Sequence, residues 1–424
     1  MWEEMMRVLW LCNLVLPDFS QEFGIKRNNF GGWMTAMMYE LEKREEINIS
    51  LCFPIYDKSR LKDGSCNNHD YYTYLDNINA ETYGPELIEA FEQILRKADP
   101  DIVHIWGTEY PHTTAMLQAC KNKGFLNKVV VDIQGLVSVC SKHYLTGIPK
   151  KYRALKSGDI TSMEEDKILF EKRGKYEIES IKMAYHVLGR TDWDRACIET
   201  INPNIQYYIC DRILRTIFYE YAAKWKYKEC KKHSVFVSQA SYPIKGFHYL
   251  LQALPVIIEK YSDTHVYVAG KDIFNVEEKE PYAVYLEALM EQLNLREHIS
   301  FIGKLDERQM IQQYLNANVF VSASTIENSP NSLSEAMILG VPCVASYVGG
   351  VYSKMTFNVE GFLYPHNEPI LLAYYICKVF ENKDNLCEKF SNNSVHKMLK
   401  IASPKHNTNR IVQIYREIES KNTK

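Results

Sequence analysis

The sequence predicts an α/β protein built from two domains, each with a parallel β-sheet. Short apolar runs alternate with amphipathic helical segments along nearly the whole chain, which is the pattern of βαβ units. This alternation stops near residues 213–232 and then starts again. The 424 residues are also enough for two or three domains, each able to bury its own core.

The first half of the chain carries apolar runs that we expect to be strands at residues 8–12, 47–53, 102–105, 129–133 and 186–188. Residues 33–41 and 87–95 instead place apolar side chains at helical spacing. Gly84-Pro85 precedes the second of these segments, and proline favours the first turn of a helix. We therefore expect a sheet covered by helices within residues 1–212.

The second half repeats this pattern, with expected strands at residues 235–237, 266–269, 299–302, 319–322 and 342–345. The stretch from residue 207 to 233 is aromatic and basic without a strand signal, so we interpret residues 213–232 as a linker to a domain of residues 233–402. Ser403-Pro404 is a favourable start for a final amphipathic helix within residues 403–424.

Composition excludes several functional classes. Lys and Arg number 50 and Asp and Glu number 53, so a net charge of −3 gives no electrostatic case for a nucleic-acid partner. The 11 cysteines are scattered singly, so we expect neither a disulfide framework nor a zinc site, and a cytoplasmic setting is natural. No apolar run approaches the roughly 20 residues that a membrane span needs.

Parallel sheets bind ligands beyond the carboxyl ends of their strands, so polar residues that follow strands are candidates for a site. The segment from Ser324 to Met337 follows an expected strand and continues into a helix. Ser329 could cap that helix with Pro330 in its first turn, which leaves backbone N–H groups and the positive end of the helix dipole for an anion. Glu327 lies in the loop ahead of this helix.

Glu335 lies inside the same helix and has two interpretations. Its carboxylate could accept two hydrogen bonds from the vicinal diol of a ribose. Equally, Ser332-x-x-Glu335 matches a capping box, in which Glu335 would bond to the backbone of its own helix.

Lys245-Gly246 stands at the start of the helix that follows residues 235–237. A lysine there opposes the helix dipole, whereas a bound phosphate would use both the lysine and the dipole. The alternative is a solvated surface lysine.

Gly31-Gly32 opens an earlier helix, where a ligand could approach the backbone, although a plain turn explains the pair equally simply. The chain contains neither G-x-G-x-x-G nor G-x-x-x-x-G-K-[ST].

Further polar residues follow strands in the first half. They are Glu109, Gln134 with Gly135, and Arg190. An arginine at a strand end suits a phosphate or a carboxylate. His143 lies beyond Gln134, and a lone histidine is more often incidental than catalytic.

The stretch from Tyr144 to Arg153 is basic and aromatic. Such a stretch is usually a solvated surface, and the alternative is peripheral contact with an anionic membrane.

The second half contains several motifs in a characteristic order: Lys245-Gly246, Gly303, Glu327-x7-Glu335-Ala336-Met337, Gly340-x-Pro342 and Gly349-Gly350. This order resembles the retaining glycosyltransferases of family 4, among them those of bacterial polysaccharide biosynthesis. The resemblance implies the GT-B fold, in which two Rossmann-like domains face each other and a C-terminal helix crosses back to the first. Residues 1–212 would then be the acceptor-side domain, residues 233–402 the nucleotide-sugar-binding domain, and residues 403–424 the returning helix.

The resemblance also implies roles for single residues. Lys245 would contact the donor diphosphate, Glu335 the ribose, and Glu327 the donor sugar. Other donor contacts would come from Gly31, Gly32, Gly303, Asn331, Ser332 and Leu333.

This chain departs from the family's usual residues at two positions. Gln239 replaces an arginine that contacts the diphosphate in many members, and Arg190 could compensate for it. Gln134 replaces a histidine near the reacting centre, and an amide could still bind a sugar hydroxyl or a leaving-group oxygen. Glu109 and His143 are expected on the acceptor side.

The expected function is transfer of a sugar from a nucleotide-sugar donor to a hydroxyl acceptor, with retention at the anomeric carbon and without a metal or other cofactor. Family habit favours a surface polysaccharide or lipid-linked glycan as acceptor, at the inner face of the cell membrane. Two alternatives remain open. One is a catalytically inactive homologue that binds a sugar nucleotide within an assembly complex, and the other is a different GT-B reaction such as epimerisation.

Overall fold

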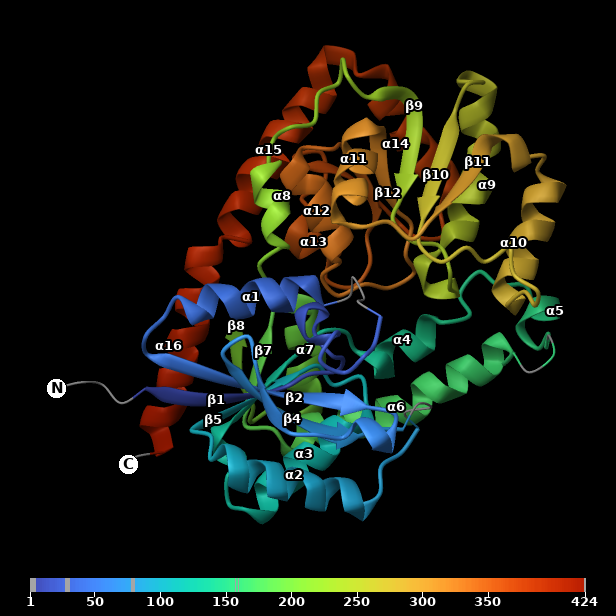
Figure 1. The fold of residues 1–424 in the computed structure, drawn as a ribbon. Helices are drawn as coiled ribbons and strands as arrows, with labels where there is room; N and C mark the ends of the chain where they lie inside the picture. The colour runs from blue at the N-terminus through green and yellow to red at the C-terminus, as the bar shows by residue number, and fades with distance from the viewer. Residues whose placement is uncertain (1–4, 27–30, 78–80, 157, 159, 423–424) are drawn as a thin grey trace. The chain divides into compact units, whose positions relative to one another are not determined.

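The fold was analysed in a computed structural model that describes residues 5–26, 31–77, 81–156, 158 and 160–422 (Figure 1). These residues form two compact units. Unit 1 contains the described residues up to Val139, Leu169–Arg215 and those from Ala402 onward. Unit 2 contains Cys140–Ile168 and Thr216–Ile401. The expected first domain, residues 1–212, included the segment Cys140–Ile168, which packs instead with the second unit.

Unit 1 is built on an eight-stranded sheet with the order β3-β4-β2-β1-β5-β6-β7-β8. All neighbouring strands are parallel except β3 and β4, which pair antiparallel at one edge. The strands are β1 (Met6–Leu11), β2 (Ile47–Ile55), β3 (Gly64–Cys66), β4 (His69–Leu75), β5 (Ile102–Trp106), β6 (Val129–Asp132), β7 (His186–Gly189) and β8 (Gln206–Ile209).

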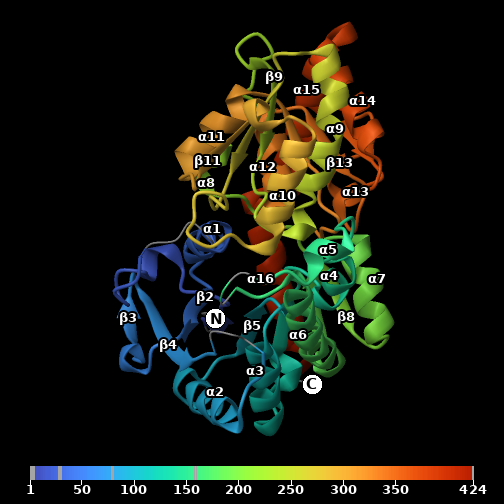
Figure 2. The ribbon, with the colours of Figure 1, turned by 90° about the vertical axis from the view of Figure 1, so that its right-hand side faces the viewer.

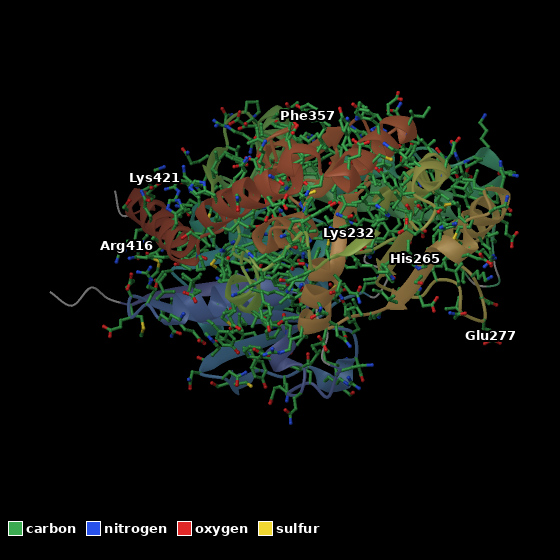
Figure 3. All side chains as sticks on the ribbon, turned by 90° about the horizontal axis from the view of Figure 1, so that it is seen from above. Lys232, His265, Glu277, Phe357, Arg416 and Lys421 are labelled. Atoms are coloured by element: carbon green, nitrogen blue, oxygen red, sulfur yellow. The ribbon has the colours of Figure 1, made fainter. Side chains whose placement is uncertain are left out.

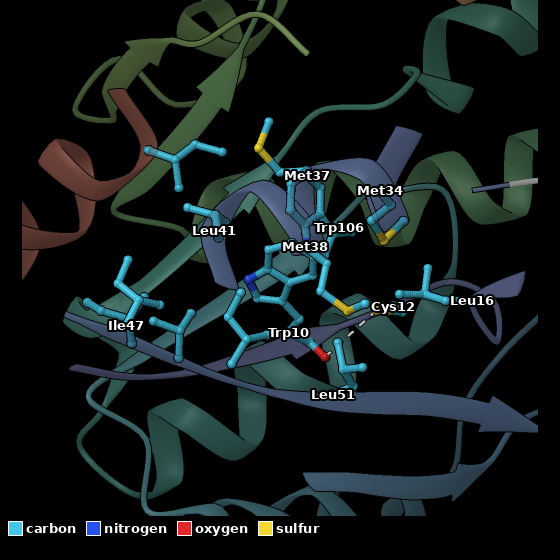
Figure 4. Packing of buried hydrophobic residues seen from close by; sticks show 14 of the residues in the cluster. Trp10, Cys12, Leu16, Met34, Met37, Met38, Leu41, Ile47, Leu51 and Trp106 are labelled. Atoms are coloured by element: carbon cyan, nitrogen blue, oxygen red, sulfur yellow. Dashed lines mark hydrogen bonds between the residues drawn. The ribbon is translucent and has the colours of Figure 1, made fainter. Parts of the chain in front are cut away.

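Helices cover both faces of this sheet, which explains why its central strands are apolar at nearly every position. Along β1, Val8 and Trp10 face one hydrophobic cluster, and Leu9 and Leu11 face the other. The first cluster is closed by α1 (Gly32–Glu42) and α16 (Pro404–Asn422), and Figure 4 shows Met34, Met37 and Met38 of α1 packed above Trp10. The second is closed by α2 (Pro85–Ala98) and α3 (Pro111–Asn122).

Helix α16 is joined to this sheet by a buried polar contact. Trp10 Nε1 donates to the Tyr415 hydroxyl at 3.3 Å, and that hydroxyl lies 2.6 Å from His104 Nδ1. Burial lowers the pKa of His104 to about 3, so the ring is neutral. Its Nδ1 therefore accepts a hydrogen bond from the Tyr415 hydroxyl. Arg416 and Lys421 of the same helix project to the surface (Figure 3). The expected return of the C-terminal helix to the first domain is confirmed.

Unit 2 has a six-stranded parallel sheet with the order β11-β10-β9-β12-β13-β14. This is the 3-2-1-4-5-6 order of doubly wound nucleotide-binding folds. The strands are β9 (Lys231–Val237), β10 (His265–Ala269), β11 (Ile299–Gly303), β12 (Ala317–Ser322), β13 (Cys343–Ser346) and β14 (Gly361–Tyr364). The predicted class, α/β with two Rossmann-like parallel sheets, is therefore confirmed.

The helices of unit 2 also lie on both faces of its sheet. Helix α9 (Phe247–Lys260) lies beside α14 (Pro369–Glu381), as Figure 2 shows. Helix α12 (Asn331–Leu339) contacts α15 (Leu386–Ile401), α11 (Glu307–Asn316) and α8 (Thr216–Glu220). Helix α10 (Pro281–Gln292) contacts α9 and α5 (Lys150–Arg153).

Some elements were not predicted. The pattern of the sequence missed β3, β4, β8 and β14, together with α4 (Val137–His143) and α6 (Met163–Met183). Strand β8 runs into the stretch from residue 207 to 233 that showed no strand signal. Strands β3 and β8 lie at the two edges of their sheet, where fewer apolar residues are buried and the sequence signal is weak.

The basic and aromatic stretch from Tyr144 to Arg153 uses its aromatic side chains for packing. The Tyr144 hydroxyl donates to Asp166 at 3.2 Å, and the rings of Tyr152 and Tyr285 lie 4.9 Å apart. All 11 cysteines are free thiols. No helix among the described residues combines the length and apolar character that crossing a membrane requires.

Candidate functional site

The candidate site of unit 2 lies at the topological switch point of its sheet. Strands β9 and β12 are neighbours there, and the strand order reverses between them. The loop after β9 carries Lys245, and the loop after β12 carries Glu327. Open α/β sheets bind ligands at this position because the two loops turn away from each other and leave a crevice.

Lys245 and Glu327 form an ion pair. Lys245 Nζ lies 2.6 Å from Glu327 Oε1, and Ser324 Oγ donates to the same oxygen at 2.8 Å. The side chains of Lys245 and Glu327 are 20% and 15% exposed, so only a small part of the ion pair is accessible to solvent. Burial by itself would lower the pKa of the Lys245 ammonium, but the adjacent Glu327 carboxylate and Tyr242 hydroxyl hold that pKa well above its usual value. Lys245 is therefore a fixed cation.

The backbone around this pair is tightly packed. Thr325 N–H donates to the Ile244 carbonyl at 2.8 Å, which joins the two loops directly. Gly246 has φ +63°, and a Cβ there would lie 2.0 Å from the Ala323 carbonyl oxygen. Gly349 has φ +48°, and a Cβ there would lie 1.9 Å from the carbonyl oxygen of Glu327. Only glycine allows these approaches, so both glycines help to fix the ion pair.

Helix α12 begins one position later than expected. Its N-cap residue is Pro330, which makes no side-chain capping bond, and Asn331 is the first helical residue. Ser329 is therefore not the N-cap. The N–H groups of Asn331, Ser332 and Leu333 are in the first turn, where no helical carbonyl is available to accept them. This helix end lies shortly after Glu327, and binding of an anion there stays a prediction.

Glu335 is buried behind this first turn, with 6% of its surface exposed. The Tyr314 hydroxyl lies 3.0 Å from the Ser332 carbonyl and 3.4 Å from Glu335 Oε2. The capping-box interpretation is wrong, because Ser332 lies inside the helix rather than at its N-cap. The contact of Tyr314 with Glu335 was not predicted, because the sequence pattern identifies Tyr314 only as a core residue of α11.

Two other donor-side candidates end strands of the same sheet. Gln239 follows β9 and its amide nitrogen lies 3.2 Å from Ser241 Oγ. Gly303 ends β11, and its carbonyl accepts the N–H of Gly270 at 3.0 Å.

In unit 1, the Gly31-Gly32 pair caps and opens α1, with Gly31 in the left-handed conformation at φ +77°. Gln134 follows β6, and its amide donates to the Trp106 carbonyl at 2.9 Å. Arg190 is 5% exposed and donates to the carbonyls of Ile133 and Gln134 at 3.1 and 2.8 Å. Burial lowers the pKa of Arg190 to about 10. These bonds direct the Arg190 guanidinium to the backbone that supports Gln134.

The two acceptor-side candidates lie in different units. Glu109 belongs to unit 1, where its carboxylate accepts the N–H of Gly135 at 2.9 Å. His143 ends α4 in unit 2, and its carbonyl accepts the hydroxyl of Thr325 at 3.3 Å. His143 is thus joined through its backbone to the loop that carries Glu327.

Other polar residues at the edge of the unit 1 sheet were overlooked. Arg212 pairs with Asp132 at the end of β6, and its guanidinium lies 3.8 Å from the centre of the Trp33 ring. Asn13 follows β1 and contacts Glu109. Both Asp132 and Asn13 come at the end of an expected strand, a signal that could have identified them.

Comparison with known proteins agrees with this geometry. Residues 218–397 match the model of the family described as "Glycosyl transferases group 1". A protein of Methanocaldococcus jannaschii named "Uncharacterized glycosyltransferase MJ1607" is 31% identical over 153 residues, which are 36% of this chain and 36% of that protein. The "D-inositol 3-phosphate glycosyltransferase" of Corynebacterium urealyticum is 26% identical over 33% of each chain. The matches span about a third to a half of the length of the curated relatives.

Solved structures resemble nearly the entire chain in fold. Sucrose-phosphate synthase from Thermosynechococcus elongatus matches with a TM-score of 0.70 and 14% identity, covering 98% of this chain and 100% of that one. Anabaena HepE, in complex with UDP and glucose, matches with a TM-score of 0.65 and 14% identity, covering 96% and 99%. The chain therefore has the GT-B class of fold. The Lys245–Glu327 pair lies within residues 218–397, the part of the chain that matches the glycosyl transferases group 1 model.

Proposed function

We propose that this protein is a glycosyltransferase that moves a sugar from a nucleotide-sugar donor to a hydroxyl acceptor. The observation that carries the proposal is the Lys245–Glu327 pair at the switch point of unit 2, immediately ahead of the α12 N-terminus. It lies within the region that matches the glycosyltransferase family. A fixed cation and a free helix N-terminus are the groups that a donor diphosphate requires.

In this proposal the donor lies along the carboxyl edge of the unit 2 sheet. Lys245 and the N–H groups of Asn331, Ser332 and Leu333 bind the diphosphate, and Glu335 accepts the ribose hydroxyls. The buried position of Glu335, oriented by the Tyr314 hydroxyl, supports a role in binding a diol. Gln239, Gly303, Gly31 and Gly32 complete the proposed donor contacts.

The proposed reaction breaks the bond between the anomeric carbon and the terminal phosphate oxygen, and its electron pair stays on the diphosphate. The acceptor oxygen bonds to the anomeric carbon on the same face, and its proton passes to the departing phosphate oxygen. Lys245 stabilises the negative charge that develops there. In this proposal, Glu327 keeps the Lys245 ammonium in place and lies close to the donor sugar. Gln134 lies beside the reacting centre. No metal or other cofactor takes part.

The proposed acceptor is a growing surface polysaccharide or a lipid-linked glycan, handled in the cytoplasm at the inner face of the cell membrane. One relative, 28% identical over 39% of this chain, is named "Phosphatidyl-myo-inositol mannosyltransferase" in Mycobacterium leprae, which supports a lipid-linked acceptor. Lys150 and Lys151 are exposed and could approach anionic lipids, while Tyr152 packs on α10.

The test is a thermal-shift screen of the full chain against UDP-, GDP-, ADP- and dTDP-sugars, followed by measurement of nucleotide release with and without hydroxyl acceptors. A bound donor should raise the melting temperature, because it binds the folded state alone. Nucleotide release that depends on the acceptor is the expected result. No shift with any donor, together with no release, would overturn the proposal.

A further inference from the structure

Unit 1 has a topological switch point of its own, between β1 and β5. Strands β2 and β4 lie on one side of β1, and β6, β7 and β8 lie beyond β5. The loop after β1 carries Asn13, and the loop after β5 carries Glu109. Asn13 Nδ2 donates to Glu109 Oε2 at 3.4 Å, so the two loops are joined where a doubly wound sheet binds its ligand.

The Glu109 carboxylate is held from two sides but is not enclosed. Its Oε1 accepts the N–H of Gly135 at 2.9 Å, and its Oε2 accepts the Asn13 amide. The residue is partly exposed, and each carboxylate oxygen can accept more than one hydrogen bond. Burial raises the pKa of Glu109, although its own backbone N–H, Arg212 and Gly135 oppose the shift. Because Glu109 is partly exposed and its oxygens have further lone pairs, it can accept a hydrogen bond from an approaching hydroxyl.

A buried chain of polar contacts holds Asn13. His112 Nε2 lies 3.0 Å from Asn13 Oδ1, and His112 Nδ1 lies 2.8 Å from Asp76 Oδ2. His112 is 1% exposed and the Asp76 side chain is 8% exposed. Because a carboxylate accepts, the Asn13 amide nitrogen must face Glu109, and its oxygen must face His112. His112 Nε2 is then the donor to Asn13 Oδ1, and the contact of Nδ1 with Asp76 Oδ2 fixes the orientation of the ring.

We propose that Glu109 accepts a hydrogen bond from the acceptor's hydroxyl group, and that Asn13, oriented by His112 and Asp76, positions Glu109 for this contact. This rests on the proposed function and adds the acceptor-binding group in unit 1. The part of the acceptor that contacts Glu109 is a neutral polyhydroxy group such as a sugar ring, because Glu109 would repel an anionic group at this position. Asn13, His112 and Asp76 are positioning residues, since they act through Glu109.

The test compares Asn13→Asp with wild type, using the hydroxyl acceptor on which the wild type has its highest turnover. Aspartate has the shape of asparagine and still accepts from His112, but it repels Glu109 instead of donating to it. The KM for the acceptor should rise about tenfold or more, because a hydrogen bond to a charged group is lost. The Kd of the nucleotide donor should stay within about twofold, because the side chains proposed to bind the diphosphate and the ribose, Lys245 and Glu335, lie in unit 2. Asn204→Asp, an exposed position of unit 1, is the matched control and should change neither value.

A second pair of variants keeps the test decisive if Asn13→Asp does not fold. His112→Gln retains a donor near Asn13 Oδ1 and should keep the acceptor KM close to wild type, whereas His112→Leu should raise it. An unchanged acceptor KM in a folded Asn13→Asp or His112→Leu protein would overturn this inference alone, and so would equal losses for donor and acceptor. Absence of transfer by the wild type would instead overturn the proposed function, and this inference with it.

Discussion

The Tyr415 hydroxyl accepts the indole N–H of Trp10, a residue 405 positions earlier in the chain. Both side chains are fully buried in one cluster together with α1. The same hydroxyl donates to His104, so a single oxygen atom satisfies two buried polar groups. Helix α16 is consequently part of the core of unit 1.

Tyr415→Phe should therefore destabilise unit 1. The change keeps the ring but leaves Trp10 Nε1 and His104 Nδ1 buried without their partner, at a cost of about 2–4 kcal/mol. Urea unfolding measures this loss. Arg416→Ala, at the next residue, breaks a surface contact of 3.9 Å to Glu46 and should cost less than about 1 kcal/mol. Equal losses for the two variants would contradict the role of the buried hydroxyl.

Lys245→Ala should lower kcat about 10²–10³-fold, because it removes the fixed cation at the departing diphosphate. The fold should persist, since unit 2 keeps its sheet and both glycine contacts. Acceptor-dependent nucleotide release is the measurement. Lys271→Ala, which breaks only the exposed pair with Glu280, serves as the control and should behave as wild type. Wild-type turnover in Lys245→Ala would show that Lys245 does not act in the reaction.

Glu335→Ala should weaken binding of a nucleoside diphosphate tenfold or more, about 1.4 kcal/mol or more, because a ribose diol loses a charged acceptor. Tyr314→Phe should weaken it by a smaller factor, since the carboxylate remains but loses the hydroxyl that orients it. Isothermal titration calorimetry measures both. Glu259→Ala, an exposed position of α9, should not change the affinity. A larger effect from Tyr314→Phe than from Glu335→Ala would reverse the assigned roles.

Comparison of Gly246→Ala with Gly124→Ala distinguishes the effect of backbone strain from the effect of a steric clash. Both glycines have positive φ, +63° and +67°, but a Cβ at Gly246 would meet the Ala323 carbonyl oxygen at 2.0 Å, and a Cβ at Gly124 would meet nothing within 4 Å. Gly124→Ala should thus cost about 1 kcal/mol of stability and leave nucleotide binding unchanged. Gly246→Ala should cost more and also weaken donor binding, because it displaces the Lys245 loop. Similar donor affinities in the two variants would argue against that displacement.

Glu177 should make stability depend on pH. Burial raises its pKa to about 7, although the N–H groups of Val137 and Ser138 and the Ser138 hydroxyl all favour the carboxylate. An ordinary glutamate in the unfolded chain titrates near about 4.3. The folded state therefore holds the proton more tightly, so this contribution is complete below about pH 4 and is lost as the pH rises to about 7. The free energy of unfolding, measured from pH 4 to 8, should fall more steeply in wild type than in Glu177→Gln. Parallel curves would contradict the shift.

Much of the fold could be predicted because the local signals agree with the tertiary structure. The pair Gly84-Pro85 begins α2 as expected, and the buried strand around Trp10 is apolar on both faces. Strand β14 was missed because its four residues resemble any short apolar run. The N-terminus of α12 was placed one residue early, since Ser329 is a good cap by type but Pro330 occupies that position.

Within the candidate site, the residues predicted from motifs were the ones with charge or unusual backbone, such as Lys245, Glu327 and Gly246. Their partners could not be predicted, because contact depends on strand order. Tyr314 carries no distinguishing local pattern. Asn13 follows an expected strand, but its contact with Glu109 could not be predicted, because it depends on β1 and β5 being neighbours in the sheet.

The placement of α16 has a consequence for folding during synthesis. Domains generally fold as units as the chain emerges. Unit 1 contains the first strand of the chain but cannot close its core until Tyr415 has been made, whereas the residues of unit 2 end at Ile401. Unit 2, second in the sequence, is therefore the first to be complete. Until α16 has been synthesised, the apolar surface around Trp10 that this helix covers stays exposed. Chaperones that bind apolar surface can bind the growing chain there.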